Sequence, residues 1–136
     1  MIKYKFLEHT ADVKFNAYGK NVNKTFENSA IAMFKSMYTG KINKTMKNKI
    51  NVSGRDYESL LYNFLEELLF LLDSKNFFIS SIKVKISQKK FKLTSIAFGD
   101  DASKYKIGLN VKAVTYNEMF VKKIKNKWIC QVVLDV

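Results

Sequence analysis

The stretch that most constrains the fold is an apolar helix predicted over residues 57–73. Asp56 stands directly before this helix, where its carboxylate can cap the first turn. The apolar residues recur at helical spacing and form a stripe wide enough to need cover on more than one side. They are Leu60, Leu61, Phe64, Leu65, Leu68, Leu69, Phe70, Leu71 and Leu72. The rest of the chain must therefore be arranged around this helix. Glu66 and Glu67 interrupt its apolar sequence, and we expect structural rather than catalytic roles because adjacent helical residues do not face one target.

The remaining elements are one more helix and a series of strands. A second amphipathic helix is predicted to begin after Asn21, a capping residue, and to end before Gly40. Residues 41–49 are polar and rich in lysine and are expected to form a solvated connection, followed by a short strand at 50–52. From residue 82 onward the chain alternates apolar and polar residues, as strands do, with turns predicted at 88–90 and 126–127.

These elements predict an α+β fold. We expect a two-layer sandwich in which a single mixed, mostly antiparallel sheet carries both helices on one face. The 136 residues suit a single domain spanning 1–136. The sheet's opposite face is expected to be solvated and to carry lysines that alternate along the strands. These are Lys83, Lys85, Lys90 and Lys92.

Several classes of site are excluded by what the chain lacks. The single cysteine, Cys130, excludes an internal disulfide and a cysteine-rich zinc site, and its apolar surroundings predict a buried thiol. His9 is the only histidine, and no glycine-rich phosphate-binding motif is present. No apolar run approaches the ~18 residues of a membrane span, and no signal-peptide pattern begins the chain. A cytoplasmic protein without membrane association is expected.

The net charge of +12 points to an attraction for RNA, although its composition limits that interpretation. Of the 24 basic residues only Arg55 is arginine, and the lysines are spread along the whole chain. An A/T-rich genome would produce the same excess of lysine and asparagine. Specific reading of bases favours arginine, so the charge indicates at most a generalised, salt-sensitive attraction.

Reactive groups are concentrated in the break between two predicted strands in residues 6–18. Residues 8–12 combine two carboxylates, an imidazole and a hydroxyl. One interpretation is a polar turn in which Thr10 and Asp12 bond to nearby backbone amides. The other is that these groups converge on a ligand outside the chain. A second acidic pair, Asp100 and Asp101, is expected at a solvated loop tip.

Two aspartates fall at predicted strand ends, Asp12 near the start of the chain and Asp135 near its end. The α-carboxylate of Val136 follows Asp135 directly. If these strand ends meet, three carboxyl groups crowd together, and each raises the pKa of the others unless a cation neutralises them. A hard divalent ion with oxygen ligands would do so.

Five segments together resemble the archease family. They are residues 7–20 (LEHTADVKFNAYGK), 26–34 (FENSAIAMF), 59–71 (SLLYNFLEELLFL), 111–116 (VKAVTY) and 132–136 (VVLDV). The resemblance implies a small α+β accessory protein of the RNA-splicing ligase that joins 2′,3′-cyclic-phosphate (or 3′-phosphate) and 5′-hydroxyl RNA ends. It implies a chaperone-like activator that promotes ligase guanylylation and multiple turnover in tRNA splicing or RNA repair. No catalysis of its own is implied.

The same resemblance assigns site residues. Asp12 and Asp135 correspond to metal ligands. The α-carboxylate of Val136, which follows Asp135, is a third candidate from its position alone, and the ion is calcium, magnesium or manganese. Lys112 of KAVTY and His9 of HTADV are assigned to functional contacts with the partner. The chain departs from the family pattern at Asn110 and Asn117, where acidic and histidine residues are common. The alternative function is a metal-independent basic RNA-binding or chaperone-like modulator that uses the lysine-rich surface.

Overall fold

A computed structural model describes all 136 residues and contains two α-helices and seven strands. A short 3-10 helix, η1 (Ala102–Lys104), follows the fifth strand. The elements in chain order are β1 (Tyr4–Leu7), β2 (Val13–Gly19), α1 (Val22–Met37), β3 (Met46–Ser53), α2 (Tyr57–Lys75), β4 (Phe77–Ser87), β5 (Lys92–Asp101), β6 (Ala113–Ile124) and β7 (Lys127–Asp135). Neither α-helix is long and apolar enough to cross a membrane.

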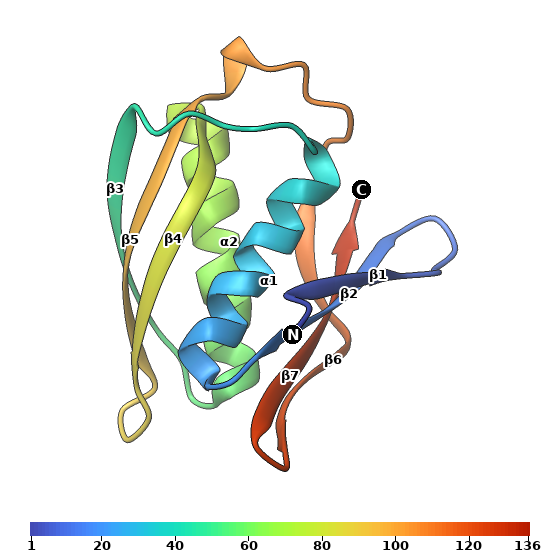
Figure 1. Cartoon of the computed structure of the whole chain (residues 1–136), viewed down its shortest axis with the longest axis vertical. Helices are drawn as coiled ribbons and strands as arrows, with labels where there is room; N and C mark the ends of the chain where they lie inside the picture. Colours follow the sequence, from blue (N-terminus) through green and yellow to red (C-terminus); the bar gives the residue numbers. More distant parts are fainter.

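The strands form two antiparallel sheets, and both helices lie between them (Figure 1). One sheet has the order β1-β2-β7-β6 and the other has the order β3-β5-β4. The predicted α+β class with two helices is confirmed. The chain forms three layers, however, instead of one sheet with helices on a single face. The reason is that both helices bury side chains around much of their circumference, so each needs cover on two sides.

A single cluster of 32 buried residues fills the space between the layers. Phe26 of α1 stacks on Phe64 of α2 with ring centroids 6.0 Å apart, and Phe34 of α1 meets Phe78 of β4 edge to face at 4.8 Å. Cys130 is buried in this core, as predicted, and burial raises the pKa of its thiol to about 12. Its thiol is therefore a packing group and not a reactive one.

Both helix starts are the predicted ones. The Asn21 side chain accepts the Lys24 backbone N–H at 2.8 Å, and Asp56 forms a reciprocal capping box with Ser59. Helix α2 ends at Asn76, which adopts the left-handed conformation with φ of 57°. Strand β3 begins at Met46, so part of the stretch expected to be a solvated connection is paired with β5.

Glutamate side chains of the helices accept hydrogen bonds from backbone N–H groups of two edge strands, β6 and β4. Glu66 of α2 accepts the Val114 N–H of β6 at 2.7 Å, and Glu58 accepts the Val121 N–H of the same strand at 3.2 Å. On the other sheet, Glu27 of α1 accepts the Val84 N–H of β4 at 2.9 Å. Free N–H groups on an edge strand would otherwise invite pairing with another chain.

Candidate functional site

Strand pairing brings the sequence-predicted site residues to one end of the four-stranded sheet. Val13, the first residue of β2, pairs with Leu134 of β7, so Asp12 lies just before β2 and Asp135 follows Leu134 at the end of β7. Asp135 also pairs with Ala113 of β6, and its carbonyl accepts the Lys112 N–H at 2.8 Å. Residues more than a hundred positions apart in the sequence thus meet where three strands begin or end. Asp135 and Lys112 are exposed, whereas Val136 is half-buried.

The connection between β1 and β2 presents His9 and Asp12. It turns through Ala11, whose φ of 69° lies in the left-handed region. Among the ion pairs and hydrogen bonds of the protein, Asp12 takes part only in a 3.7 Å contact between its Oδ2 and His9 Nδ1. That distance is too long for a hydrogen bond, so His9 Nδ1 is buried without a partner. The Asp12 carboxylate accepts no hydrogen bond from a nearby backbone amide, so the polar-turn interpretation fails for Asp12.

Glu118 lies beside His9 in this site, and no sequence pattern predicted that it would. Residues 116–119 bulge out of β6 between the pairs Thr115–Val133 and Phe120–Gln131, and Glu118 has a φ of 54°. Its carboxylate oxygens lie 3.1 Å from His9 Nε2 and 3.1 Å from Lys14 Nζ. The contact with Lys14, and to a smaller extent the contact with His9, lowers the pKa of the Glu118 carboxyl below its usual range. The bulge thereby ties β6 to the connection that carries Asp12.

The side-chain oxygens at this end of the sheet are too few to bind a hard cation unless main-chain oxygens also act as ligands. No three His, Cys, Asp or Glu side chains are grouped so that they could hold a metal ion by themselves. The sheet end offers two carboxylates, Asp12 and Asp135, and a main-chain oxygen of Val136 beside them. Oxygen donors of this kind fit calcium, magnesium or manganese and do not fit a soft metal that prefers sulfur.

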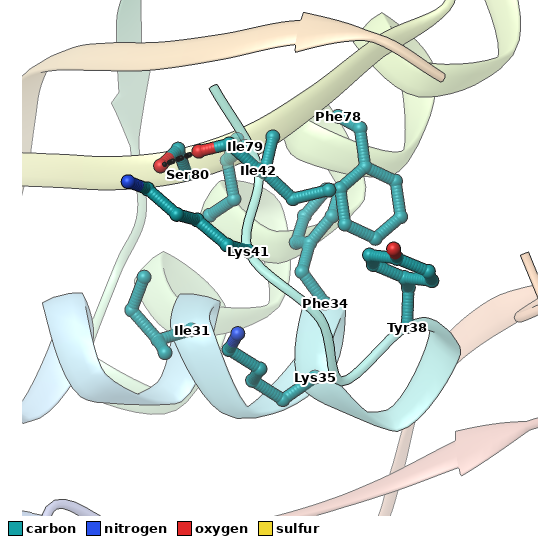
Figure 2. A pocket seen from close by; sticks show the side chains of 9 residues that line it. All are labelled: Ile31, Phe34, Lys35, Tyr38, Lys41, Ile42, Phe78, Ile79 and Ser80. Carbon is teal, nitrogen blue, oxygen red and sulfur yellow. Dashed lines mark hydrogen bonds between the residues drawn. The ribbon is translucent and has the colours of Figure 1, made fainter. Parts of the chain in front are cut away.

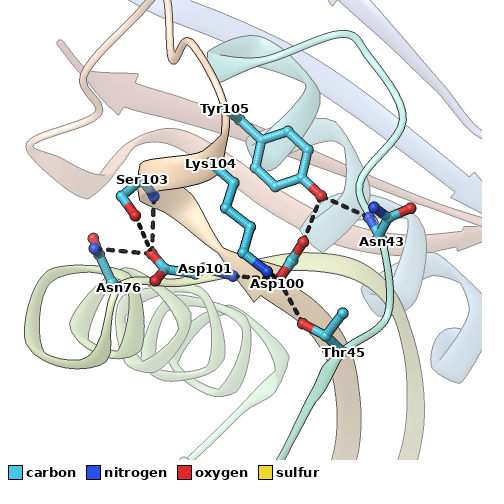
Figure 3. A network of polar contacts seen from close by, with 8 residues as sticks. All are labelled: Asn43, Thr45, Asn76, Asp100, Asp101, Ser103, Lys104 and Tyr105. Carbon is cyan, nitrogen blue, oxygen red and sulfur yellow. Dashed lines mark hydrogen bonds and ion pairs between the residues drawn. The ribbon is translucent and has the colours of Figure 1, made fainter.

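The second acidic pair has a different environment from the one predicted. Asp100 is not at a solvated loop tip but is only 1% exposed at the end of β5. It accepts hydrogen bonds from the Thr45 hydroxyl, from the Tyr105 hydroxyl at 2.7 Å and from Lys104 Nζ at 3.2 Å (Figure 3). Asp101 accepts from Ser103 and from Asn76. This network joins the connection before β3 to the turn after β5, and its oxygens are used within the protein.

An apolar cavity lies between α1 and β4. Its volume is about 290 Å³, and the rings of Phe34, Tyr38 and Phe78 line one part of it (Figure 2). Lys35 at its rim donates to the Gly40 carbonyl at 3.1 Å. The predicted site residues contribute nothing to this cavity.

Comparisons with known proteins agree over nearly the whole chain. The Archease protein family matches residues 4–136. Proteins named archease from Sulfurisphaera tokodaii and Pyrococcus furiosus are 38% and 39% identical over 139 and 142 aligned residues, covering all of this chain and all of each relative. A solution structure of a Methanobacterium thermoautotrophicum protein has a TM-score of 0.84 at 34% identity, covering 98% of this chain and 99% of that one. A Thermotoga maritima crystal structure, described as an archease and possible chaperone, shares the fold with a TM-score of 0.68 at 18% identity over 97% of this chain and 96% of its own.

Proposed function

This chain belongs to the archease family, and we propose that it is an accessory protein of an RNA-splicing ligase. In this role it promotes guanylylation and multiple turnover of the ligase in tRNA splicing or RNA repair, and it catalyses no reaction itself. The observation that carries the proposal is the strand register that gathers Asp12, Asp135, Lys112 and Val136 at one end of the sheet. Nothing in the packing of the core requires charged residues there, since Asp135 and Lys112 are exposed.

In the proposed site, Asp12 and Asp135 hold a divalent ion together with a main-chain oxygen of Val136. Calcium, magnesium and manganese all accept such oxygen ligands. The ion would supply a positive charge that an anionic group of the ligase or of its nucleotide can bind. Lys112, exposed at the same sheet end, would contact an anionic group of the partner.

His9 and Glu118 are proposed to position the connection that carries Asp12. Glu118 bonds to His9 Nε2 and to Lys14, so the imidazole is fixed with its Nδ1 toward Asp12. The hydrogen bond between His9 Nε2 and Glu118 also supports a non-catalytic role, because one nitrogen of the only imidazole in the chain is already used within the protein.

The test is a multiple-turnover ligation assay with the ligase and an RNA that has cyclic-phosphate and 5′-hydroxyl ends. We expect Asp12→Ala and Asp135→Ala each to abolish the stimulation given by the wild-type protein, because each removes one ligand and one unit of charge together. Both variants should remain folded, since neither side chain accepts a hydrogen bond that the fold needs. Asp73→Ala is the matched control, because Asp73 is an exposed aspartate on α2. Full stimulation by either site variant would overturn the metal-site assignment.

Thermal unfolding with and without added ion separates the metal site from a general effect on folding. An ion that binds only the native state raises the melting temperature. We expect calcium, magnesium or manganese to raise the melting temperature of the wild type and of Asp73→Ala but not that of Asp12→Ala. An equal rise in all three proteins would place the ion elsewhere.

The alternative function is a metal-independent RNA-binding modulator. One observation favours it: the three-stranded sheet β3-β5-β4, which does not contain Asp12, carries several exposed lysines. Capture from native extract distinguishes the two functions. Recovery of the ligase at moderate salt supports the accessory role, whereas recovery of bulk RNA without ligase supports the alternative.

A further inference from the structure

The outer face of the three-stranded sheet carries an unpaired group of lysines. Both helices lie on the inner side of this sheet, and no further layer covers its outer side (Figure 1). Pairing places Lys49 of β3 and Lys83 of β4 on either side of Ile96 in the central strand β5. The lysine face is defined here as Lys47, Lys49, Lys83 and Lys85 together with Ile96 and Phe98.

The charges of the lysine face are not balanced within the protein. Strands β3 and β4 contain no Asp or Glu, and the only acids of β5, Asp100 and Asp101, stand at its end, where Asp100 is buried and bonded to Thr45, Tyr105 and Lys104. The five ion pairs of the protein involve only Lys14, Lys24, Lys104 and His9 as cations, so all four lysines of this face lack a carboxylate within 4.0 Å. The lysines of β3 and β4 repel one another across β5, and a bound polyanion would relieve that repulsion. A biased composition explains the number of lysines but not the absence of an ion-pair partner for all four lysines of this face.

Between the two lysine rows the surface is neutral and hollowed. A depression of about 410 Å³ is lined by Lys49, Asn51, Lys83, Lys85, Thr94 and Ile96, among others. Phe98, half-buried in the same central strand, has the Lys47 ammonium 5.9 Å from its ring centroid. Because neighbouring strands are about 4.8 Å apart, the two rows lie about 10 Å from each other.

Cations on both sides of a neutral floor with an accessible aromatic ring fit a single-stranded nucleic acid. Such proteins combine a positive groove that follows the backbone with aromatic side chains on which bases stack. A membrane surface fits less well, because the face offers only two apolar side chains, Ile96 and Phe98, and both are half-buried, which leaves little apolar area to insert into lipid. Sequence-specific reading is not expected, since the face has no arginine.

We infer that the lysine face binds single-stranded RNA without sequence preference, with phosphates along the lysine rows and a base against Phe98. The choice of RNA over DNA rests on the proposed function, whereas the site itself rests only on the geometry of the sheet. The face lies on the opposite side of the helices from the sheet that carries Asp12 and Asp135 (Figure 1). One molecule can therefore contact RNA and a protein partner at the same time.

The experiment measures binding of a fluorescein-labelled oligouridylate of twelve nucleotides by anisotropy over a range of salt concentrations. The site variant replaces Lys47, Lys49, Lys83 and Lys85 with glutamine. The matched control replaces four exposed lysines around the β6–β7 turn with glutamine, and both variants lower the net charge by four. The control positions are Lys122, Lys123, Lys125 and Lys127.

We expect the site variant to bind at least ten times more weakly than wild type and the control less than three times more weakly. The slope of log affinity against log salt should fall by about 3 in the site variant, since each lost contact to a single strand removes ~0.7. Equal weakening in both variants would mean that only the net charge matters and would overturn the inference.

Two further measurements complete the test. Phe98→Leu should weaken binding about tenfold with an unchanged salt slope, because a stacked base is lost without a charge. Asp12→Ala should keep full affinity for oligouridylate, so failure of the ligase proposal and failure of this inference are distinguishable. Binding of anionic phosphatidylserine vesicles by wild type, lost in the site variant, with no binding of oligouridylate, would overturn RNA as the ligand.

Discussion

Asp100 shows how strongly single residues of this protein depend on their tertiary neighbours. Hydrogen bonds from Thr45 and Tyr105 lower its pKa, outweighing the opposite effect of burial, and the Asp101 amide and Lys104 lower it further. These partners come from the connection before β3 and from the turn after β5. The ionised carboxylate therefore adds side-chain bonds between the end of β5, the residues just before β3 and the turn after β5.

The depressed pKa of Asp100 predicts a loss of stability in acid. Its ordinary value is 3.8, and the folded value is lower. The contribution to stability is therefore fully present above the ordinary value and disappears as the pH falls through the folded value. We expect Asp100→Asn to be less stable than wild type at pH 6 and to lose less stability than wild type between pH 5 and pH 2, measured by urea unfolding. Asp73→Asn, at an exposed position, should behave like wild type, and a parallel pH dependence of Asp100→Asn would refute the assignment.

At the level of elements, the helices do more than cover the sheets. Glu58 and Glu66 bind backbone amides along β6, and Glu27 does the same for β4. Each helix thereby replaces a missing neighbouring strand at one edge of a sheet. The arrangement explains why Glu66 stands in the middle of the otherwise apolar helix α2.

A pair of adjacent glutamates tests this function of α2. Glu66→Ala should lower the free energy of unfolding by about 1–3 kcal/mol, because the buried Val114 N–H loses a charged acceptor. Glu67→Ala should change the free energy of unfolding by less than about 0.5 kcal/mol, since Glu67 makes no such bond. Glu66→Gln keeps an acceptor oxygen and should lie between the two. Urea denaturation at neutral pH measures all three, and equal losses for Glu66→Ala and Glu67→Ala would contradict the edge contact.

On the scale of the whole molecule, the two sheets are held together through the helices. The 32-residue core includes Phe15 from one sheet and Phe78 from the other, with Phe26 and Phe64 stacked between them. The two candidate surfaces lie on different sheets, at the strand ends around Asp12 and on the outer lysine face.

The shared core predicts a single cooperative unfolding transition. Trp128 of β7 contacts Tyr57 of α2 at 5.2 Å between ring centroids, so its fluorescence reports on the four-stranded sheet. Far-UV circular dichroism at 222 nm reports mainly on the helices. We expect the two signals to give the same midpoint in urea, as all-or-none unfolding requires. Separate midpoints would show that the four-stranded sheet unfolds independently of the helices.

The sequence by itself determined the local features of the protein. Both helices, their caps at Asn21 and Asp56, the hairpin turn after β4 and the burial of Cys130 follow from patterns within a few residues. The placement of Asp12 and Asp135 at strand ends was predictable for the same reason, because apolar alternation stops beside them. Periodicity and capping are short-range properties, so a single sequence records them.

Only the tertiary structure decided how these elements combine. Alternation along a strand does not encode which strand lies beside it, so the division into two sheets was not predictable. For the same reason the sequence could not show that Glu118 reaches His9 from a bulge in β6, or that the two acidic residues at the end of β5 are held inside a network. These contacts between distant residues form only when both helices are covered by a sheet on each side. That condition depends on how the whole chain packs and not on any short segment of it.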